Sequence, residues 1–253
     1  AHVGIVADPA TVVAQLLEHV TAFEANPDWQ RAFEQAEQMA KAQKTEGRDS
    51  AEIPIHPQRF ANEVGAFFGD EAIIAVDGGD IVSTTARWLQ TSEPGHLLDP
   101  GPFGSLGTGP GYAIAAKVAF PERRVGLVFG DGGFGFNGFE YDTMIRHGLP
   151  VVGVMGNDGV WSNIKTVHQT FFPDRVVAAD LGRRPYAPVV EAMGGHGELV
   201  TEPDQIGPAL RRAEASGLPS LVEVHIAETM RMSSNYAQRT STSRPSSGVS
   251  YRA

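Results

Sequence analysis

Two apolar runs, each ending in a glycine-rich turn and separated by one helical segment, constrain this chain more than any other feature. The run Val125 to Phe129 indicates a buried strand and ends in Gly130-Asp131-Gly132-Gly133. After a helical segment at about residues 138–147, a second apolar run, Val151 to Met155, ends in Gly156-Asn157-Asp158-Gly159. This succession predicts parallel strands with polar residues at their carboxyl ends, where ligands bind in open α/β sheets.

A dinucleotide site is the first alternative for the turn after residue 129. Gly130, Gly132 and Gly135 match the G-x-G-x-x-G pattern, and Asp158 fits the place of the ribose-binding acid. Asp131 argues against this alternative, because like charges about 4 Å apart repel by roughly 4 kcal/mol at an effective dielectric near 20. A carboxylate beside a diphosphate becomes favourable once a divalent cation lies between them.

Oxygen atoms on the two turns suit a magnesium ion. Mg²⁺ prefers an octahedron of oxygens, usually one or two side chains completed by phosphate oxygens and water. Asp131 can supply a carboxylate oxygen, Asn157 an amide oxygen and Gly159 a backbone carbonyl. The sequence therefore predicts a Mg²⁺-anchored diphosphate if the two strands are neighbours in the sheet.

The pair of turns resembles a known signature. Gly130-Asp131-Gly132, followed by Asn157 after 157 − 131 = 26 positions, resembles the GDG…N motif of thiamine diphosphate (ThDP) enzymes of the acetolactate synthase and pyruvate decarboxylase superfamily. The resemblance implies that Asp131, Asn157 and the Gly159 carbonyl hold Mg²⁺. Gly156-Asn157 stands where the family usually has two Asn, and the ligand is the second of them, so we expect the site to be kept.

The same resemblance assigns further cofactor contacts. It implies that Gly78 and Gly79, in the turn Asp77-Gly78-Gly79-Asp80, contact the diphosphate together with Gly132 and Gly133, and it leaves Asp80 open. Gly104 and Leu106 align with the segment that grips the aminopyrimidine ring and bends the cofactor, with Leu106 as the apolar wedge.

The candidates for catalysis and for substrate binding are assigned from their place in the sequence. Glu140, which opens the helix after the GDG turn, is the catalytic candidate, with an equally weighted alternative as a carboxylate that favours the helix start. Trp161 is a substrate candidate, although a core position is the commoner one for Trp. The sequence after Glu228 is basic, with no acid, and its arginines suit capture of coenzyme A phosphates by a lid; these candidates are Arg231, Arg239 and Arg244.

The expected fold class is α/β, a doubly wound parallel sheet with helices on both faces, as in the diphosphate-binding domain of ThDP enzymes. The resemblance divides the chain into the end of a middle domain with a strand and a helix (residues 1–24), a linker with an amphipathic helix (25–54), the ThDP and Mg²⁺ domain (55–228) and the basic tail (229–253). It also implies that the first third or more of the working enzyme lies outside this sequence, together with the Glu that activates the pyrimidine ring.

The composition argues against two classes of binding partner. A formal charge of −10 argues against nucleic acid or an anionic membrane surface, and no apolar run approaches the roughly 20 residues of a membrane span. The absence of Cys fits a reducing, cytoplasmic compartment.

The strings FGSLGTGPGYAIAAK, GDGGFGFNGFEYDTMIRHGLPV and GNDGVW are most similar to the 2-hydroxyacyl-CoA lyases and their acetolactate-synthase-like relatives. The similarity implies reversible cleavage of a 2-hydroxyacyl-CoA to formyl-CoA and an aldehyde or ketone, in a homodimer or homotetramer. The alternatives are an acetolactate synthase or 2-keto acid decarboxylase, and then a NAD-binding domain or a silent regulatory protein of this fold.

Overall fold

The computed structural model describes residues 3–20 and 26–228, and it divides into two compact units whose boundary in the sequence lies between Gln43 and Lys44. The first unit holds α1 (Pro9–His19) and α2 (Pro27–Thr45), which continues just past the boundary. The side chain of Asp8 accepts a 2.8 Å hydrogen bond from the Thr11 N–H and so caps α1. The amphipathic helix predicted after Asn26-Pro27 is confirmed as α2.

The strand predicted at the start of the chain is wrong for the described residues, because residues 3–8 form no strand. A strand needs a neighbouring strand to pair its backbone groups, and the described part of the first unit offers only helices. The domain boundaries predicted from the resemblance stay a prediction.

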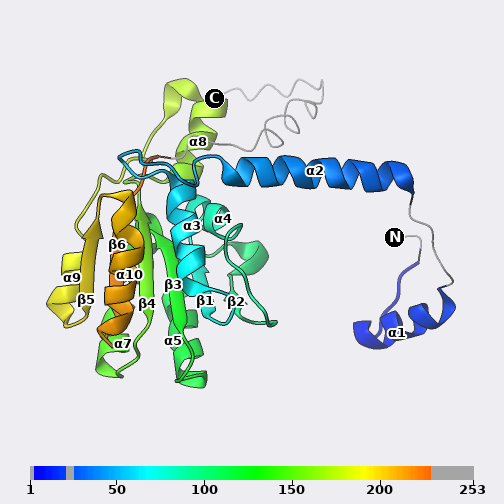
Figure 1. The fold of residues 1–253 in the computed structure, drawn as a ribbon, viewed down its shortest axis with the longest axis horizontal. Coiled ribbons are helices and arrows are strands. Elements are labelled where there is room, and N and C mark those ends of the chain that lie inside the picture. The colour runs from blue at the N-terminus through cyan, green and yellow to red at the C-terminus, as the bar shows by residue number, and fades with distance from the viewer. Residues whose placement is uncertain (1–2, 21–25, 229–253) are drawn as a thin grey trace, which may run out of the picture. The chain divides into compact units, whose positions relative to one another are not determined.

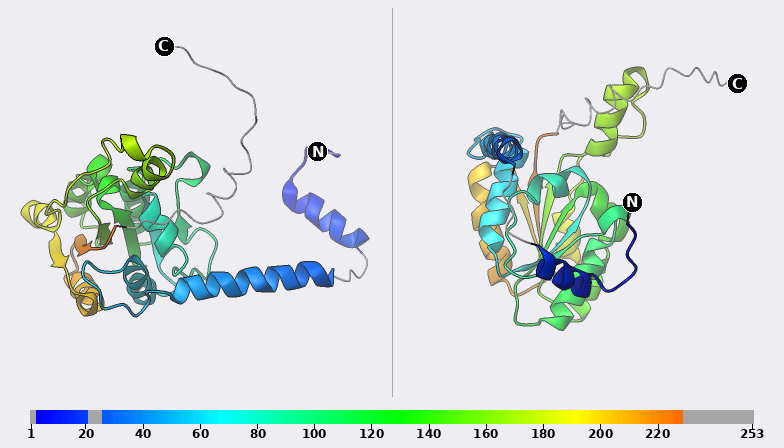
Figure 2. Two further views of the ribbon diagram at one scale, coloured as in Figure 1. Left: turned by 90° about the horizontal axis from the view of Figure 1, so that it is seen from above. Right: turned by 90° about the vertical axis from the view of Figure 1, so that its right-hand side faces the viewer.

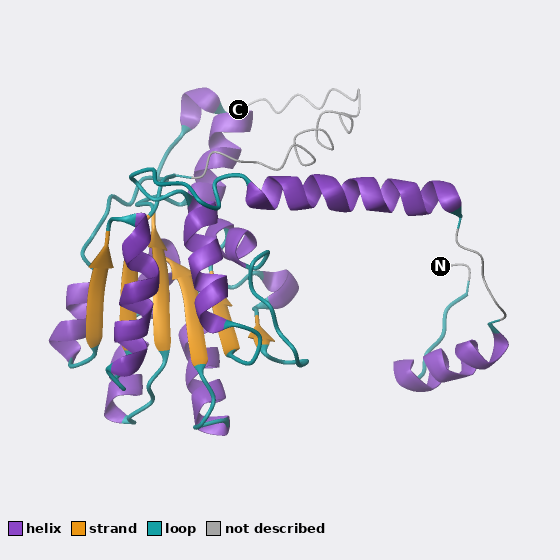
Figure 3. Cartoon of the chain, in the orientation of Figure 1, coloured by secondary structure: helices purple, strands orange, loops and turns teal. Residues whose placement is uncertain are grey.

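The second unit is built on six strands in the order β2-β1-β3-β4-β6-β5, all of them paired in parallel. All strand arrowheads point to one edge of the sheet, and α8 lies beyond that edge (Figures 1 and 3). The strands are β1 (Ile73–Asp77), β2 (Leu97–Leu98), β3 (Val125–Gly130), β4 (Val152–Asn157), β5 (His196–Val200) and β6 (Ser220–His225).

Helices cover both faces of this sheet, as predicted (Figure 2). Neighbouring strand residues alternate between the two cores; in β1, Ile74 packs on one face and Ile73 on the other. The first core also contains residues of α3 (Pro57–Phe68), α4 (Asp80–Thr85) and α10 (Ile206–Ala215). The second contains residues of α5 (Gly109–Ala119), α6 (Asp131–Asn137), α7 (Glu140–Arg146) and α9 (Ala187–Met193). The predicted doubly wound α/β fold is confirmed.

The short elements complete the connections of the second unit. They are the helix α8 (Ser162–Phe171) and the 3-10 turns η1 (Gly101–Phe103), η2 (Pro173–Arg175) and η3 (Pro203–Gln205). Among the described residues, none of the helices combines the length and the apolar character that a membrane crossing needs.

The chain after β3 differs from the expected single helix. The helix begins at once, at Asp131, and breaks near Gly138 before α7 starts at Glu140. A Cβ on Gly138 would lie 2.4 Å from the Phe134 ring, so the break lets this ring pack against the backbone. The turn predicted at Asp131 is therefore the first turn of a helix, which places its backbone N–H groups at the sheet edge.

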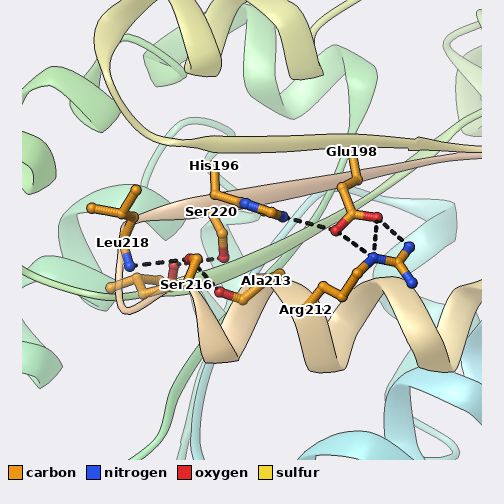
Figure 4. A network of polar contacts seen from close by, with 8 residues as sticks. His196, Glu198, Arg212, Ala213, Ser216, Leu218 and Ser220 are labelled. Atoms are coloured by element: carbon orange, nitrogen blue, oxygen red, sulfur yellow. Dashed lines mark hydrogen bonds and ion pairs between the residues drawn. The ribbon is translucent and has the colours of Figure 1, made fainter.

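The edge strand β5 is held to α10 by a polar network (Figure 4). Arg212 Nε donates to both carboxylate oxygens of Glu198, at 3.1 and 3.2 Å, and His196 Nε2 lies 2.8 Å from Glu198 Oε1. Burial alone would raise the pKa of Glu198, but the hydrogen bonds from Arg212 and His196 lower it below its usual value. This network stabilises the outer strand.

Candidate functional site

The site lies at the carboxyl ends of β3 and β4, the two central strands. Gly130 pairs with Gly156 in the parallel ladder, so Asp131 and Asn157 each follow at the next position. The neighbouring turns on which the predicted metal site depends are therefore adjacent, as the sequence required.

Asp131 is almost fully buried, with 2% of its surface exposed. The backbone N–H groups of Asp131 itself, Gly132 and Gly159 favour the charged form of its carboxylate. Burial, and then repulsion from Asp158, outweigh them and raise the pKa of Asp131 to about 7. Its Oδ2 atom is buried and has no hydrogen-bond partner among the described residues.

Asn157 is completely buried. Its Nδ2 donates to Glu223 Oε1 at 2.7 Å and to the Arg184 carbonyl at 3.3 Å. Its Oδ1 atom, like Asp131 Oδ2, has no hydrogen-bond partner in the described part of the chain. The NH₂ group of the amide is therefore held by two acceptors, while its oxygen accepts no hydrogen bond from the described residues.

Two unused, buried oxygens on adjacent strand ends fit a hard cation. Buried polar atoms normally have a partner, and leaving one without costs about 1–3 kcal/mol. A divalent cation such as Mg²⁺ takes carboxylate and amide oxygens and leaves its remaining positions to phosphate and water. The residues present therefore fit the implied metal, although the structure describes no group of three or more His, Cys, Asp or Glu suited to a metal.

The predicted third ligand, the carbonyl of Gly159, already has partners. It accepts hydrogen bonds from the N–H groups of Leu181 and Gly182, both at 2.8 Å. A carbonyl oxygen has two lone pairs, so this atom is less available than the oxygens of Asp131 and Asn157. Its role as a ligand stays a prediction.

The structure gives a local reason for Gly156. A Cβ built on it would lie 2.6 Å from Ile81 Cδ1 and 3.0 Å from Ile226 Cδ1. Both side chains belong to the first core, so a side chain at position 156 would displace them.

A cavity of about 360 Å³ opens beside these strand ends. It brings together segments that are far apart in the sequence: the turn after β1, the loop before α5, the start of α6 and the start of α8. Its lining includes most of the predicted cofactor contacts, namely Gly78, Gly79, Gly104, Leu106, Asp131, Gly132 and Gly133.

Asp77, which the sequence left without a role, is not among the residues that line this cavity. It is buried, with 1% of its surface exposed, and its carboxylate accepts the N–H groups of Gly107 at 3.0 Å and Gly109 at 2.9 Å. Burial raises the pKa of Asp77, and these two hydrogen bonds oppose that rise. Asp77 therefore anchors the loop that carries Leu106 into the cavity.

The part of the cavity beside Asp131 carries a second acid. Asp158 also lines it, and its side chain accepts from the Val160 N–H at 3.2 Å and from the Ser162 hydroxyl. Burial is the main cause that raises the pKa of Asp158, and the charges of Asp80 and Glu228 add to it. The acids attract a cation and repel a diphosphate that binds without one.

Trp161 lines the cavity and packs on the GDG turn. A Cβ on Gly132 would lie 2.4 Å from the Trp161 ring, so only glycine admits this contact. The ring also meets Phe136 edge to face, with centroids 6.0 Å apart. Trp161 thus forms a wall of the cavity, and its contact with a substrate stays a prediction.

Three groups of candidates are not among the residues that line the cavity. Asn157 and Gly159 are adjacent in the sequence to residues that line it, but are not lining residues themselves. Glu140 is half-buried and is not among the cavity's lining residues. It is the first residue of α7, where a carboxylate stabilises the start of a helix. The arginines proposed for coenzyme A, Arg231, Arg239 and Arg244, lie outside the described residues.

Sequence reasoning missed two buried acids that support the site, Asp77 and Glu223. Glu223 is completely buried and holds Asn157. A signal existed for it, because a lone acid inside the apolar run Leu221 to Val224 needs a buried partner. Asp77 was visible as an acid at a strand end, but its partners are backbone groups that carry no sequence mark.

Comparison with known proteins gives one family. Residues 77–224 match the family described as "Thiamine pyrophosphate enzyme, C-terminal TPP binding domain". A solved structure, a thiamine diphosphate-dependent 4-hydroxybenzoylformate decarboxylase from Rhodococcus jostii, is similar with a TM-score of 0.66 and 22% identity, covering 72% of this chain and 34% of that one. At that identity the likeness shows the fold alone.

Curated relatives carry two different names. A protein of Mycobacterium bovis named probable acetolactate synthase is 46% identical over 197 residues, which cover 78% of this chain and 36% of the relative. The 2-hydroxyacyl-CoA lyase 2 of Caenorhabditis elegans is 35% identical over 205 residues, covering 79% of this chain and 32% of the relative. The human protein of that name is 32% identical over 231 residues, covering 88% and 36%. This chain spans about a third of the length of these relatives.

Proposed function

Because this chain belongs to the thiamine pyrophosphate enzymes and contains their C-terminal TPP-binding domain, we propose that the complete protein is a ThDP- and Mg²⁺-dependent enzyme that makes or breaks a carbon–carbon bond beside a carbonyl group. The observation that carries the metal part is the pair of unused buried oxygens, Asp131 Oδ2 and Asn157 Oδ1. The dinucleotide alternative is set aside, since the family match includes the turn on which it rested.

Asp131 and Asn157 would hold the metal, and the metal would anchor the diphosphate. The neighbouring glycines Gly78 and Gly79 line the cavity, and their lack of a side chain lets phosphate oxygens approach the backbone there. The first turn of α6 turns its N–H groups toward the same edge, which favours a negative group there. These residues bind and orient; they move no proton.

ThDP, when bound, supplies the electron sink that the chemistry at a carbonyl carbon needs. The chain's own contribution on the ring side is apolar: Leu106 offers a partly exposed side chain in the cavity, held in place through the loop that Asp77 anchors. Trp161 covers the turn at Gly132 and limits access of water to the diphosphate side.

Two substrate classes remain, and we place a 2-oxo acid first, in a reaction of the acetolactate synthase type. The support is identity, 46% to a relative named probable acetolactate synthase against 35% and 32% to relatives named 2-hydroxyacyl-CoA lyase 2. The sequence prediction had the lyase first. It stays as the second candidate because the basic sequence after Glu228 suits coenzyme A phosphates.

We further propose that activity needs the rest of the protein and a second copy of it. The resemblance places the Glu that activates the pyrimidine ring in a neighbouring subunit, outside this chain. Under this proposal the chain by itself holds the metal ligands but turns over no substrate.

The experiment uses the complete protein with ThDP and Mg²⁺. Release of carbon dioxide from a 2-oxo acid such as pyruvate supports the first candidate, and release of formyl-CoA from a 2-hydroxyacyl-CoA supports the second. ThDP binding that is equally tight with Mg²⁺ and with excess EDTA would contradict the proposal, whichever substrate is used.

A further inference from the structure

We propose that Glu223 is a positioning residue for the metal site: its carboxylate fixes the side-chain amide of Asn157 so that the amide oxygen faces the cation. This inference rests on the proposed function, since it concerns the metal that Asp131 and Asn157 would hold. Glu223 itself lies on β6, beside β4 in the sheet, and is not among the residues that line the cavity.

Glu223 is an unusual residue for its position. It is completely buried in a strand whose neighbours are apolar. A buried carboxylate is costly unless hydrogen bonds satisfy its oxygens. Glu223 Oε2 accepts the N–H groups of Tyr186 at 2.8 Å and Ala187 at 2.9 Å, at the start of α9. These two bonds hold one side of the carboxylate.

The other oxygen holds Asn157. Glu223 Oε1 accepts Asn157 Nδ2 at 2.7 Å, and His225 Nε2 lies 3.5 Å from the same oxygen. An ionised carboxylate only accepts hydrogen bonds, so the amide must present its NH₂ side to Glu223. Its oxygen then faces the opposite direction, where it has no partner among the described residues.

The segment before α9 contacts both Asn157 and Gly159. The Arg184 carbonyl also accepts from Asn157 Nδ2, at 3.3 Å, which reinforces the same amide orientation. The N–H groups of Leu181 and Gly182 hold the Gly159 carbonyl. Glu223 links this segment to the metal ligand, because it is bound to both.

The substitution Glu223→Gln reverses the polarity of this contact with little change in shape. The glutamine oxygen satisfies the two N–H groups at the start of α9, and its NH₂ group then faces Asn157. Asn157 must turn its oxygen toward this donor and its own NH₂ toward the cation. Loss of a group that orients a metal ligand typically weakens metal binding by roughly 10- to 100-fold, and we expect a weakening in that range.

A second substitution restores the polarity. In the double variant E223Q/N157D, one oxygen of the new aspartate accepts from the glutamine, and the other faces the cation as an acceptor. The Arg184 carbonyl loses its longer, 3.3 Å hydrogen bond from residue 157 in this variant. The double variant carries the same net charge as the wild type. We expect it to bind the metal at least ten times more tightly than E223Q. Because a carboxylate ligand by itself also attracts a divalent cation, the single variant N157D is measured as well. The gain in Mn²⁺ affinity from N157D should be at least tenfold larger in the E223Q background than beside the native Glu223, and a merely structural role of Glu223 predicts equal gains.

The test measures Mn²⁺ binding by electron paramagnetic resonance in the complete protein with ThDP present, with urea unfolding as the check on folding. E198Q is the matched control, because Glu198 is a glutamate on the neighbouring strand β5 whose partners are His196 and Arg212; its Mn²⁺ affinity should equal that of the wild type.

Unchanged Mn²⁺ affinity in folded E223Q, or a double variant that binds no better than E223Q, overturns the assignment. If E223Q does not fold, the double variant decides alone: it must fold and bind Mn²⁺ within tenfold of the wild type. A wild type that binds no Mn²⁺ with ThDP instead refutes the proposed function, and this inference with it.

Discussion

The substitution Asp131→Asn should stabilise the metal-free protein, and the gain should grow with pH. Burial and the charge of Asp158 raise the pKa of Asp131 from 3.8 to about 7 in the folded state. Between these values the folded protein holds a proton that the unfolded chain has released, so the cost of this residue rises with pH and levels off above about 7. The shift of about three units, at 1.36 kcal/mol each, sets an upper value of about 4 kcal/mol at pH 8, against less than about 2 kcal/mol at pH 5.

The assay is urea unfolding of wild type and D131N in EDTA at pH 5 and pH 8. Asparagine has nearly the same shape and keeps an acceptor for the N–H groups around it, so it removes chiefly the buried charge. The free energy of unfolding of D131N should exceed that of the wild type by more at pH 8 than at pH 5. With Mg²⁺ and ThDP the order should reverse, because only the wild type gains ligand stabilisation. An equal difference at both pH values, or a less stable D131N at pH 8 in EDTA, refutes the reasoning.

Three further substitutions test the parts around the site. Y141F removes the 3.0 Å hydrogen bond from the buried Tyr141 hydroxyl to the Ser220 carbonyl. The free energy of unfolding, measured in urea, should fall by about 1–2 kcal/mol. An unchanged value would show that this buried hydrogen bond does not stabilise the fold. D77A leaves two buried N–H groups unpaired and should cost about 2 kcal/mol or more, with weaker ThDP binding; full stability would show that the loop does not depend on Asp77. L106A changes a partly exposed side chain, so unfolding should shift by less than about 1 kcal/mol while calorimetry shows weaker ThDP binding; unchanged binding would remove Leu106 from the ring contact.

The sheet, and the place of Asp131 and Asn157 at the ends of neighbouring strands, could be predicted because their signals are local. Apolar runs such as Val125 to Phe129 identify strands buried on both faces, and a polar residue placed directly after such a run must lie at the sheet edge. Asp131 and Asn157 therefore followed from two short stretches and one assumption, that their strands are neighbours. The pairing of Gly130 with Gly156 confirms that assumption.

The supporting contacts could not be predicted because they join distant segments. Asp77 binds backbone N–H groups about thirty positions away, and Glu223 binds Asn157 across 66 positions. The partners are two glycine N–H groups and one asparagine, and nothing in the sequence marks them as contacts of these acids. The immediate start of α6 at Asp131 was missed for a different reason: glycines normally interrupt helices, and here the packing of Phe134 and Trp161 on the glycine backbone overrides that tendency.

We propose that Asp131 and Asn157 would hold a cation, and with it a diphosphate, at the carboxyl ends of β3 and β4. This proposal is tested most directly by calorimetric titration of ThDP into the complete protein, with Mg²⁺ and with EDTA, for the wild type and for D131A. We expect binding to the wild type that depends on Mg²⁺ and is weakened at least tenfold, about 1.4 kcal/mol, in D131A. Binding of ThDP that is equally tight in D131A, or indifferent to Mg²⁺, would contradict it.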